Sequence, residues 1–201
     1  MFVAGLTGGI ATGKSAVSSI MRQAGAVIID ADKIAFDAVQ KGMPAWHDIV
    51  RVFGGGVLAD DGQIDRVGLG DIIFNDSRLK DKLDDIVHPV VKAEMDRRIE
   101  EVREAMPSAV VILDVPLLIE TGMQESLSEV ILVYAPVHIQ TARLMARDGI
   151  SRQDAGARIS SQMPIDEKKR YATIVIDNSL SLDLTSSRAI EVYRHLSGLA
   201  V

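Results

Sequence analysis

A short apolar run that ends in a glycine-rich turn most limits how this chain can fold. Residues 1–17 read MFVAGLTGGIATGKSAV, and residues 8–15 within them fit the pattern G-x-x-x-x-G-K-[ST]. This pattern binds phosphate only where the turn joins a buried strand to the start of a helix, because backbone N–H groups must converge on one point. The opening of the chain therefore predicts a strand, a phosphate-binding turn and a helix.

The residue types in this turn suit a nucleoside triphosphate. Glycines let the backbone curve until successive N–H groups face phosphate oxygens, Lys14 can reach the β- and γ-phosphates, and the Ser15 hydroxyl can ligate Mg²⁺. The alternative is a glycine turn with an incidental surface lysine, which the strand and helix context disfavours. We predict a phosphate-binding loop (P-loop) made of Gly8, Gly9, Ile10, Ala11, Thr12, Gly13, Lys14 and Ser15.

Five apolar runs rich in Val and Ile recur along the chain. They are near-continuously apolar, as strands buried on both faces of a parallel sheet are, and helical periodicity fills the segments between them. Strand and helix in alternation predict an α/β, doubly wound, three-layer fold of the P-loop NTPase type with a five-stranded parallel sheet. The runs are residues 1–6, 26–30, 109–115, 130–134 and 173–177.

Two longer excursions interrupt this alternation within a single domain, residues 1–201. Residues 32–105 read as a helical insertion that binds the substrate, with two helical stretches meeting at His88-Pro89. Residues 138–170 read as a lid rich in basic residues. Within it, Ser151 and Asp154 resemble a capping box that opens a helix ending before Pro164.

Two aspartates lie at the ends of predicted strands, at the sheet edge where ligands bind in open α/β folds. Asp32 is a candidate general base for an attacking hydroxyl, or else caps the following helix. Asp114 is a candidate ligand of Mg²⁺, directly or through a water, or else a turn residue.

Arg143 and Arg147 lie one helical turn apart and could close over a phosphoryl group, or else form a solvated helix face. Arg158 and residues 168–170 fit the solvated interpretation more readily.

Composition narrows the class of protein. The chain has no cysteine, which fits a reducing compartment and excludes a disulfide framework. A net charge of −6 disfavours a nucleic-acid backbone as the main ligand. The four histidines show no metal-ligand spacing. No signal peptide or membrane span is indicated, so we expect a cytoplasmic protein, monomeric or a weak homo-oligomer, with no nucleic-acid or membrane partner.

Several motifs together resemble the dephospho-coenzyme A kinase family. GLTGGIATGKS, DAD, GQIDRVGLGDIIF, IVHP, LDVPLLIE, TARLMARDGIS, RISSQM and VIDN occur here in that family's order, from residue 2 to residue 178. The resemblance implies transfer of the γ-phosphoryl group of ATP, with Mg²⁺, to the ribose 3′-hydroxyl of dephospho-coenzyme A, the last step of coenzyme A synthesis. It also implies a helical coenzyme A domain and a lid.

By the same resemblance, Asp32 is the general base and Ala16 extends the ATP-binding P-loop. Arg143 and Arg147 match lid arginines, and Asn178 is expected near the adenine. Arg66 and His88 become candidates for substrate contact. The chain departs from the family pattern at Ala11-Thr12, where Gly-Ser is usual, and at Thr173 and Leu180.

Two alternatives stay open at the level of the sequence. One is another P-loop small-molecule kinase, such as a nucleoside monophosphate kinase, which the long insertion disfavours. The other is a nucleotide-dependent switch of the GTPase type, because residues 65–68 spell D-x-x-G. That match does not follow a buried strand, and no guanine-reading Asn-Lys-x-Asp stretch occurs in the sequence.

Overall fold

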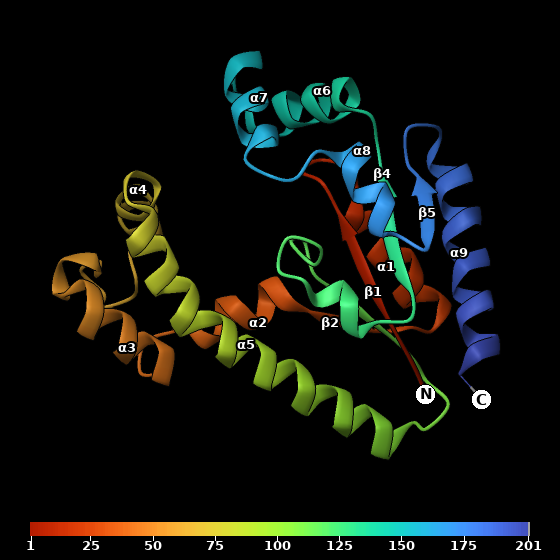
Figure 1. Ribbon diagram of the computed structural model, residues 1–201, viewed down its shortest axis with the longest axis horizontal. Helices are drawn as coiled ribbons and strands as arrows, with labels where there is room; N and C mark the ends of the chain where they lie inside the picture. Colours follow the sequence, from red (N-terminus) through yellow and green to blue (C-terminus); the bar gives the residue numbers. More distant parts are fainter. Residues whose placement is uncertain (201) are drawn as a thin grey trace. The chain divides into compact units, whose positions relative to one another are not determined.

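A parallel sheet of five strands, in the order β2-β3-β1-β4-β5, organises the chain (Figure 1). The computed structural model describes residues 1–200, apart from the side chains at positions 74 and 75. Each strand coincides with one of the predicted apolar runs, which confirms the predicted fold class. The strands are β1 (Phe2–Gly8), β2 (Val27–Asp30), β3 (Val110–Asp114), β4 (Val130–Tyr134) and β5 (Ile174–Asp177).

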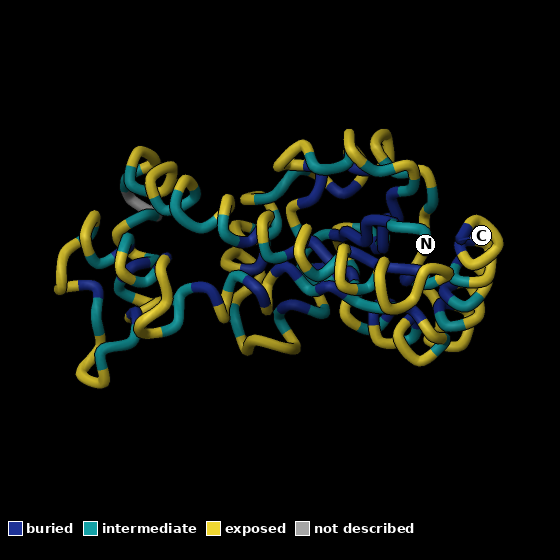
Figure 2. The backbone as a smooth tube through the Cα atoms, turned by 90° about the horizontal axis from the view of Figure 1, so that it is seen from below, coloured by how far each residue is buried: buried dark blue, intermediate teal, exposed yellow. Residues whose placement is uncertain are grey.

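Burial explains the apolar character of these runs. Leu6 of β1 and Ile131 of β4 are fully buried in a cluster with residues of α1 (Lys14–Ala24) and α9 (Leu182–Leu199), so these two helices cover one face of the sheet. Each such side chain contributes about 1.5–3 kcal/mol through its removal from water. Figure 2 shows the buried stretches in dark blue.

The other face of the sheet is covered in part by the chain that follows β3. A Cβ placed on Gly5 would lie 2.5 Å from Cδ1 of Leu118 and 2.8 Å from Cδ1 of Leu127, so this segment packs closely where it crosses β1. The register pairs Leu6 of β1 with Asp114 of β3. Asp114 therefore lies beside β1 just before the P-loop begins.

The predicted lid contains short helices. Ser151 accepts a hydrogen bond from the backbone N–H of Asp154 at the start of α7, which confirms the predicted helix start, and α7 ends before Pro164 as expected. The elements between β3 and β5, other than β4, are η2 (Met123–Ser126), α6 (Val137–Asp148), α7 (Arg152–Ser160), α8 (Ile165–Lys168) and η3 (Lys169–Tyr171).

The described chain divides into two compact units. Met1–Asp30 and the part from Glu101 onward form the first, and Ala31–Glu100 form the second. The second unit has its own core, in which Ile49, Val57, Ile64 and Leu69 are buried. Its elements are α2 (Ala31–Ala38), α3 (Pro44–Phe53), η1 (Gly55–Val57), α4 (Arg66–Asn75) and α5 (Ser77–Ala105). The last residues of α5, from Glu101 onward, belong to the first unit.

One predicted helix boundary is wrong. The expected break at His88-Pro89 does not occur, and α5 runs from Ser77 to Ala105 with Pro89 inside it. A proline in a helix interior costs about 3 kcal/mol, since it removes one backbone donor and crowds the preceding turn. Packing on both sides of Pro89 offsets that cost: Val87 packs against the core of the second unit, while Val91 and Met95 are buried.

Candidate active site

The P-loop joins β1 to α1, and its glycines are required by close approach of other atoms. Gly13 has φ +93°, and a Cβ placed there would lie 2.0 Å from Nδ2 of Asn178. A Cβ on Gly8 would lie 2.6 Å from Oγ1 of Thr12, whose hydroxyl donates to the Gly9 carbonyl at 2.9 Å. Because α1 begins at Lys14, its N-terminal N–H groups face this turn.

Ala11 is the non-glycine residue with positive φ in the described chain, at 59°. We expect Ala11→Gly to raise the free energy of unfolding by about 0.5–1 kcal/mol, because left-handed backbone costs an L-residue more than glycine loses in entropy. Thermal melting should then shift upward by about 2–3 °C. Ala142→Gly, at an exposed position inside α6, is the matched control and should lower the melting temperature. A decrease at both positions would contradict the strain argument.

The C-terminal part of the chain holds the P-loop at the carbonyl of Thr12. Nδ2 of Asn178 donates to this oxygen at 2.7 Å, and Nη1 of Arg143 donates to it at 3.4 Å. Nη2 of Arg143 also donates to the Asn178 carbonyl at 2.8 Å, and Oγ1 of Thr185 donates to Oδ1 of Asn178 at 2.8 Å. The structure thus brings together Arg143 and Asn178, two residues predicted separately, on the P-loop backbone.

Lys14 and Asp114 form an ion pair at the carboxyl ends of β1 and β3. Their side chains are 15% and 6% exposed, respectively, so the pair is largely shielded from water. A shielded carboxylate is stable as an anion only beside a positive charge, which Lys14 supplies here. Ser15 follows in the first turn of α1 and is exposed. The P-loop lysine and the predicted Mg²⁺ ligand are therefore direct neighbours.

Arg147 lies on α6 one turn beyond Arg143 but faces a different partner. Its Nε donates to Oδ1 of Asp148 at 2.7 Å, and Arg158 donates to Oδ2 of the same carboxylate at 2.8 Å. The hydrogen bond from Arg147 lowers the pKa of Asp148 and raises the pKa of Arg147. Arg147 is 62% exposed, so its pair with Asp148 lies at the surface, and the second pair, between Asp148 and Arg158, links α6 to α7.

The other predicted residues belong to the second unit. Asp32 lies exposed in the first turn of α2, directly after β2 in the chain. Arg66, the first residue of α4, lies 4.2 Å above the ring of Phe36, a cation–π contact. His88 on α5 is exposed, with Nε2 3.7 Å from Oδ1 of Asp84.

Two polar side chains near the P-loop were not predicted from the sequence. Oε1 of Gln162 accepts a hydrogen bond from the backbone N–H of Ile10 at 3.0 Å. Lys168, expected on a solvated face, is fully buried and pairs with Glu120 at 2.7 Å. A signal for both contacts was present in the sequence, because Gln162 lies in RISSQM and Glu120 in LDVPLLIE, two of the motifs that carry the family resemblance.

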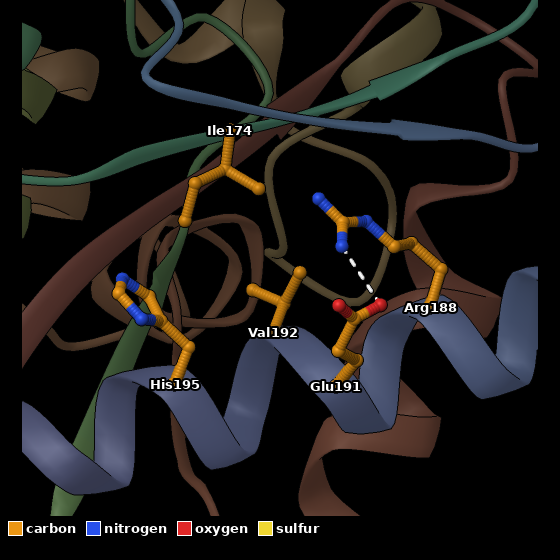
Figure 3. Close-up of a pocket in the computed structure, with 5 residues that line it drawn as sticks. All are labelled: Ile174, Arg188, Glu191, Val192 and His195. Carbon is orange, nitrogen blue, oxygen red and sulfur yellow. Dashed lines mark ion pairs between the residues drawn. The ribbon is translucent and has the colours of Figure 1, made fainter.

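The pocket whose lining residues are drawn in Figure 3 lies elsewhere. It is lined by Arg188, Glu191, Val192 and His195 of α9 and by Ile174, the first residue of β5. Its position at the start of β5 is the opposite end of the strand from Asn178. Arg188 and Glu191 neutralise each other at 2.8 Å. We assign it no role in phosphate binding.

Comparison with known proteins decides between the kinases that the P-loop allows. The family model described as dephospho-CoA kinase matches residues 2–183, which include the P-loop, the predicted insertion and the predicted lid. The chain belongs to the dephospho-CoA kinase family. Membership makes it a kinase, a phosphotransferase, with ATP as the phosphoryl donor that the family implies.

Similarity to individual members of the dephospho-CoA kinase family extends over nearly the full chain. The dephospho-CoA kinase of Symbiobacterium thermophilum is 46% identical over 199 residues, which cover 98% of this chain and 82% of the relative. That of Moorella thermoacetica is 43% identical over 201 residues, covering 98% and 95%. The solved dephospho-CoA kinase from Campylobacter jejuni superposes with a TM-score of 0.74 at 30% identity, covering 99% and 98%.

Dephospho-CoA kinase membership also confirms the main functional prediction over the GTPase-like alternative. The D-x-x-G match has a structural explanation, because Oδ1 of Asp65 accepts from the N–H groups of Val67 and Gly68 and caps α4. No helix in the described part of the chain combines the length and apolar character needed to cross a membrane.

Proposed function

We propose that this site phosphorylates the ribose 3′-hydroxyl of dephospho-CoA with ATP, the last step of coenzyme A synthesis. The observation that supports it most strongly is the family match over residues 2–183, together with a P-loop whose lysine and strand-end aspartate are adjacent. In this proposal residues 8–16 of the P-loop bind the phosphates of ATP through backbone N–H groups and Lys14.

Binding of ATP changes the partner of Lys14. The ammonium group that neutralises Asp114 turns to the β- and γ-phosphates, where negative charge accumulates during transfer. Asp114 then loses its counter-charge. With ATP bound, the Asp114 carboxylate therefore needs another cation to neutralise its charge.

The oxygen ligands of Ser15 and Asp114 fit Mg²⁺. This ion prefers oxygen donors, keeps several waters and takes much of its coordination from substrate phosphates. The site therefore does not need a preformed cluster of three ligands, and no such cluster occurs among the described residues. When bound, Mg²⁺ neutralises charge on the phosphate oxygens. In this proposal Ser15 contacts it directly, and Asp114 directly or through a water.

Asp32 acts as the general base in this proposal. Its carboxylate takes the proton of the ribose 3′-hydroxyl as the oxygen–phosphorus bond forms and the bond to the leaving ADP oxygen breaks. Its place two residues after β2 in the chain, in an exposed first turn of a helix, supports this assignment. Residues 32–105 serve as the substrate-binding insertion, in which Arg66 and His88 are candidate contacts to dephospho-CoA.

Residues 138–170 serve as the lid, with Arg143 as the arginine that stabilises the transferring phosphoryl group. Its guanidinium already lies at the Thr12 carbonyl, within the P-loop, which supports that role. Arg147 contacts the nucleotide in this proposal only after leaving Asp148. Asn178 stays a predicted neighbour of the adenine, and its contact with Thr12 also supports a place beside the P-loop.

The test of the proposed function is ADP release from ATP and Mg²⁺ with different acceptors. We expect release with dephospho-CoA and background release with AMP, UMP and shikimate. Release with AMP or UMP alone would instead assign the chain to the nucleoside monophosphate kinases. Phosphorus NMR of the product should show a new 3′-phosphomonoester.

The cytoplasmic location expected from the sequence stays a prediction. The monomeric or weakly associated state expected from the sequence also stays a prediction, which sedimentation would check.

A further inference from the structure

Lys168 is a buried charge that phosphate binding does not use. The residue is fully buried in α8, so its ammonium group cannot touch ATP or dephospho-CoA. Lysine is rarely buried to this extent unless its charge is paired and its donors are satisfied. A side chain held inside the protein at that energetic cost needs an explanation in terms of what it contacts.

The ammonium group makes three polar contacts, one for each of its hydrogens. Nζ lies 2.7 Å from Oε1 of Glu120, 3.3 Å from the carbonyl oxygen of Gly8 and 3.4 Å from the carbonyl oxygen of Pro116. Two of these partners are backbone atoms, whose positions the side chain therefore ties together. The charge is compensated by Glu120, whose side chain is 21% exposed.

The two carbonyls belong to the two segments that carry the phosphate chemistry. Gly8 is the first residue of the P-loop, and Pro116 lies two residues beyond Asp114. Lys168 thus fixes the loop that carries Lys14 relative to the loop that carries Asp114. The Thr7 hydroxyl also donates to the Pro116 carbonyl, at 2.9 Å, and reinforces the same junction.

The same contacts reach the lid. Oε1 of Glu120 accepts a hydrogen bond from the backbone N–H of Met163 at 3.3 Å, in the segment that leads from α7 to α8. The neighbouring Gln162 holds the Ile10 N–H, and Ile165 packs on Gly9, where an added Cβ would lie 3.5 Å from its Cδ1. The segment from Gln162 to Lys168 is therefore attached to the first half of the P-loop at several points.

We propose that Lys168, held by Glu120, is a positioning residue for phosphoryl transfer, which sets the P-loop lysine and the strand-end aspartate in register and links both to the lid. The inference rests on the proposed function. A well-packed apolar pair could fill the same volume without the cost of burying charge. Apolar side chains cannot, however, donate to two backbone carbonyls at once, which fits a role in geometry rather than in stability alone.

The experiment compares Lys168→Met, Glu120→Gln and the double variant with the parent protein, by kcat, by KM for both substrates and by melting temperature. Lys168→Met leaves Glu120 without its cationic partner, so we expect a lower melting temperature together with a kcat about 10- to 100-fold lower. The double variant removes both charges and should recover much of the melting temperature while kcat stays low. KM for dephospho-CoA should change little in all three variants.

Recovery of both melting temperature and kcat in the double variant would overturn the proposal, because charge compensation alone would then explain the pair. The double variant leaves no uncompensated buried charge, so it is expected to fold even if a single variant does not, and it keeps the proposal testable. Arg188→Met, which removes an exposed cation of α9 that pairs with Glu191, is the matched control and should stay within about twofold of the parent. A parent protein inactive on dephospho-CoA would instead contradict the proposed function.

Discussion

We expect Asp32→Asn to lower kcat by about 10²- to 10⁴-fold, which is the usual contribution of a positioned general base. Asparagine has nearly the same shape as aspartate but cannot accept the proton of the ribose hydroxyl. ATP binding should be retained, because the phosphates are bound by residues 8–16 in this proposal. The measurements are steady-state ADP release with dephospho-CoA and calorimetric titration with ATP.

A matched substitution on the same helix separates loss of the base from general damage to α2. Asp37→Asn changes another exposed aspartate of α2, five residues further along, and should leave kcat within about twofold, since exposed charges far from the reacting atoms contribute little. Turnover of Asp32→Asn at the parental level would remove Asp32 from the role of base. Equal losses in the two variants would point to a disturbed helix instead.

The strands and the P-loop could be predicted because their causes are local. A strand buried on both faces needs a continuous run of apolar residues, so β3 could be recognised from VVILD without knowledge of its neighbours. Gly13 of the P-loop is likewise required by backbone geometry, as its φ of +93° shows. Requirements of this kind are visible in a short stretch of sequence.

The errors lie where distant parts of the chain decide the outcome. Pro89 indicates a helix end by its own chemistry, but packing on both sides of it keeps α5 continuous. Lys168 lies beside two further basic residues and so resembles a solvated run. Its actual partners are Glu120 and two carbonyls, of which Gly8 is 160 residues away in sequence. No local pattern reports such partners.

The contact between Asn178 and the P-loop falls between these cases. VIDN was recognised as a motif, and Asn178 could be placed at the end of a strand. Its amide donates to the Thr12 carbonyl and occupies the space left by the missing side chain of Gly13. This contact depends on how β5 lies against the P-loop, which no local pattern reports. Sequence reasoning found the residue and missed its partner.

Replacing the P-loop lysine should have the second large effect. We expect Lys14→Met to lower kcat by about 10²- to 10³-fold, because a preorganised positive charge at the β- and γ-phosphates is lost where charge develops in the transition state. Methionine keeps much of the aliphatic stem, so packing around it is largely conserved. The measurement is single-turnover transfer at saturating ATP, Mg²⁺ and dephospho-CoA, which separates the chemical step from product release.

The ion pair with Asp114 allows the Lys14→Met variant to be tested by its stability as well as by its rate. Lys14→Met leaves a carboxylate that is 6% exposed without its counter-charge, so the free energy of unfolding should fall by about 1–3 kcal/mol in the absence of nucleotide. Adding Asp114→Asn should restore that stability but not the rate, because the neutral amide needs no cation while the phosphates still lack one. Restored turnover in the double variant would mean that Lys14 acts only by neutralising Asp114. Because Asp114→Asn by itself also removes the proposed Mg²⁺ ligand, regained stability with a rate below that of Asp114→Asn alone would place the charge of Lys14 at the phosphates.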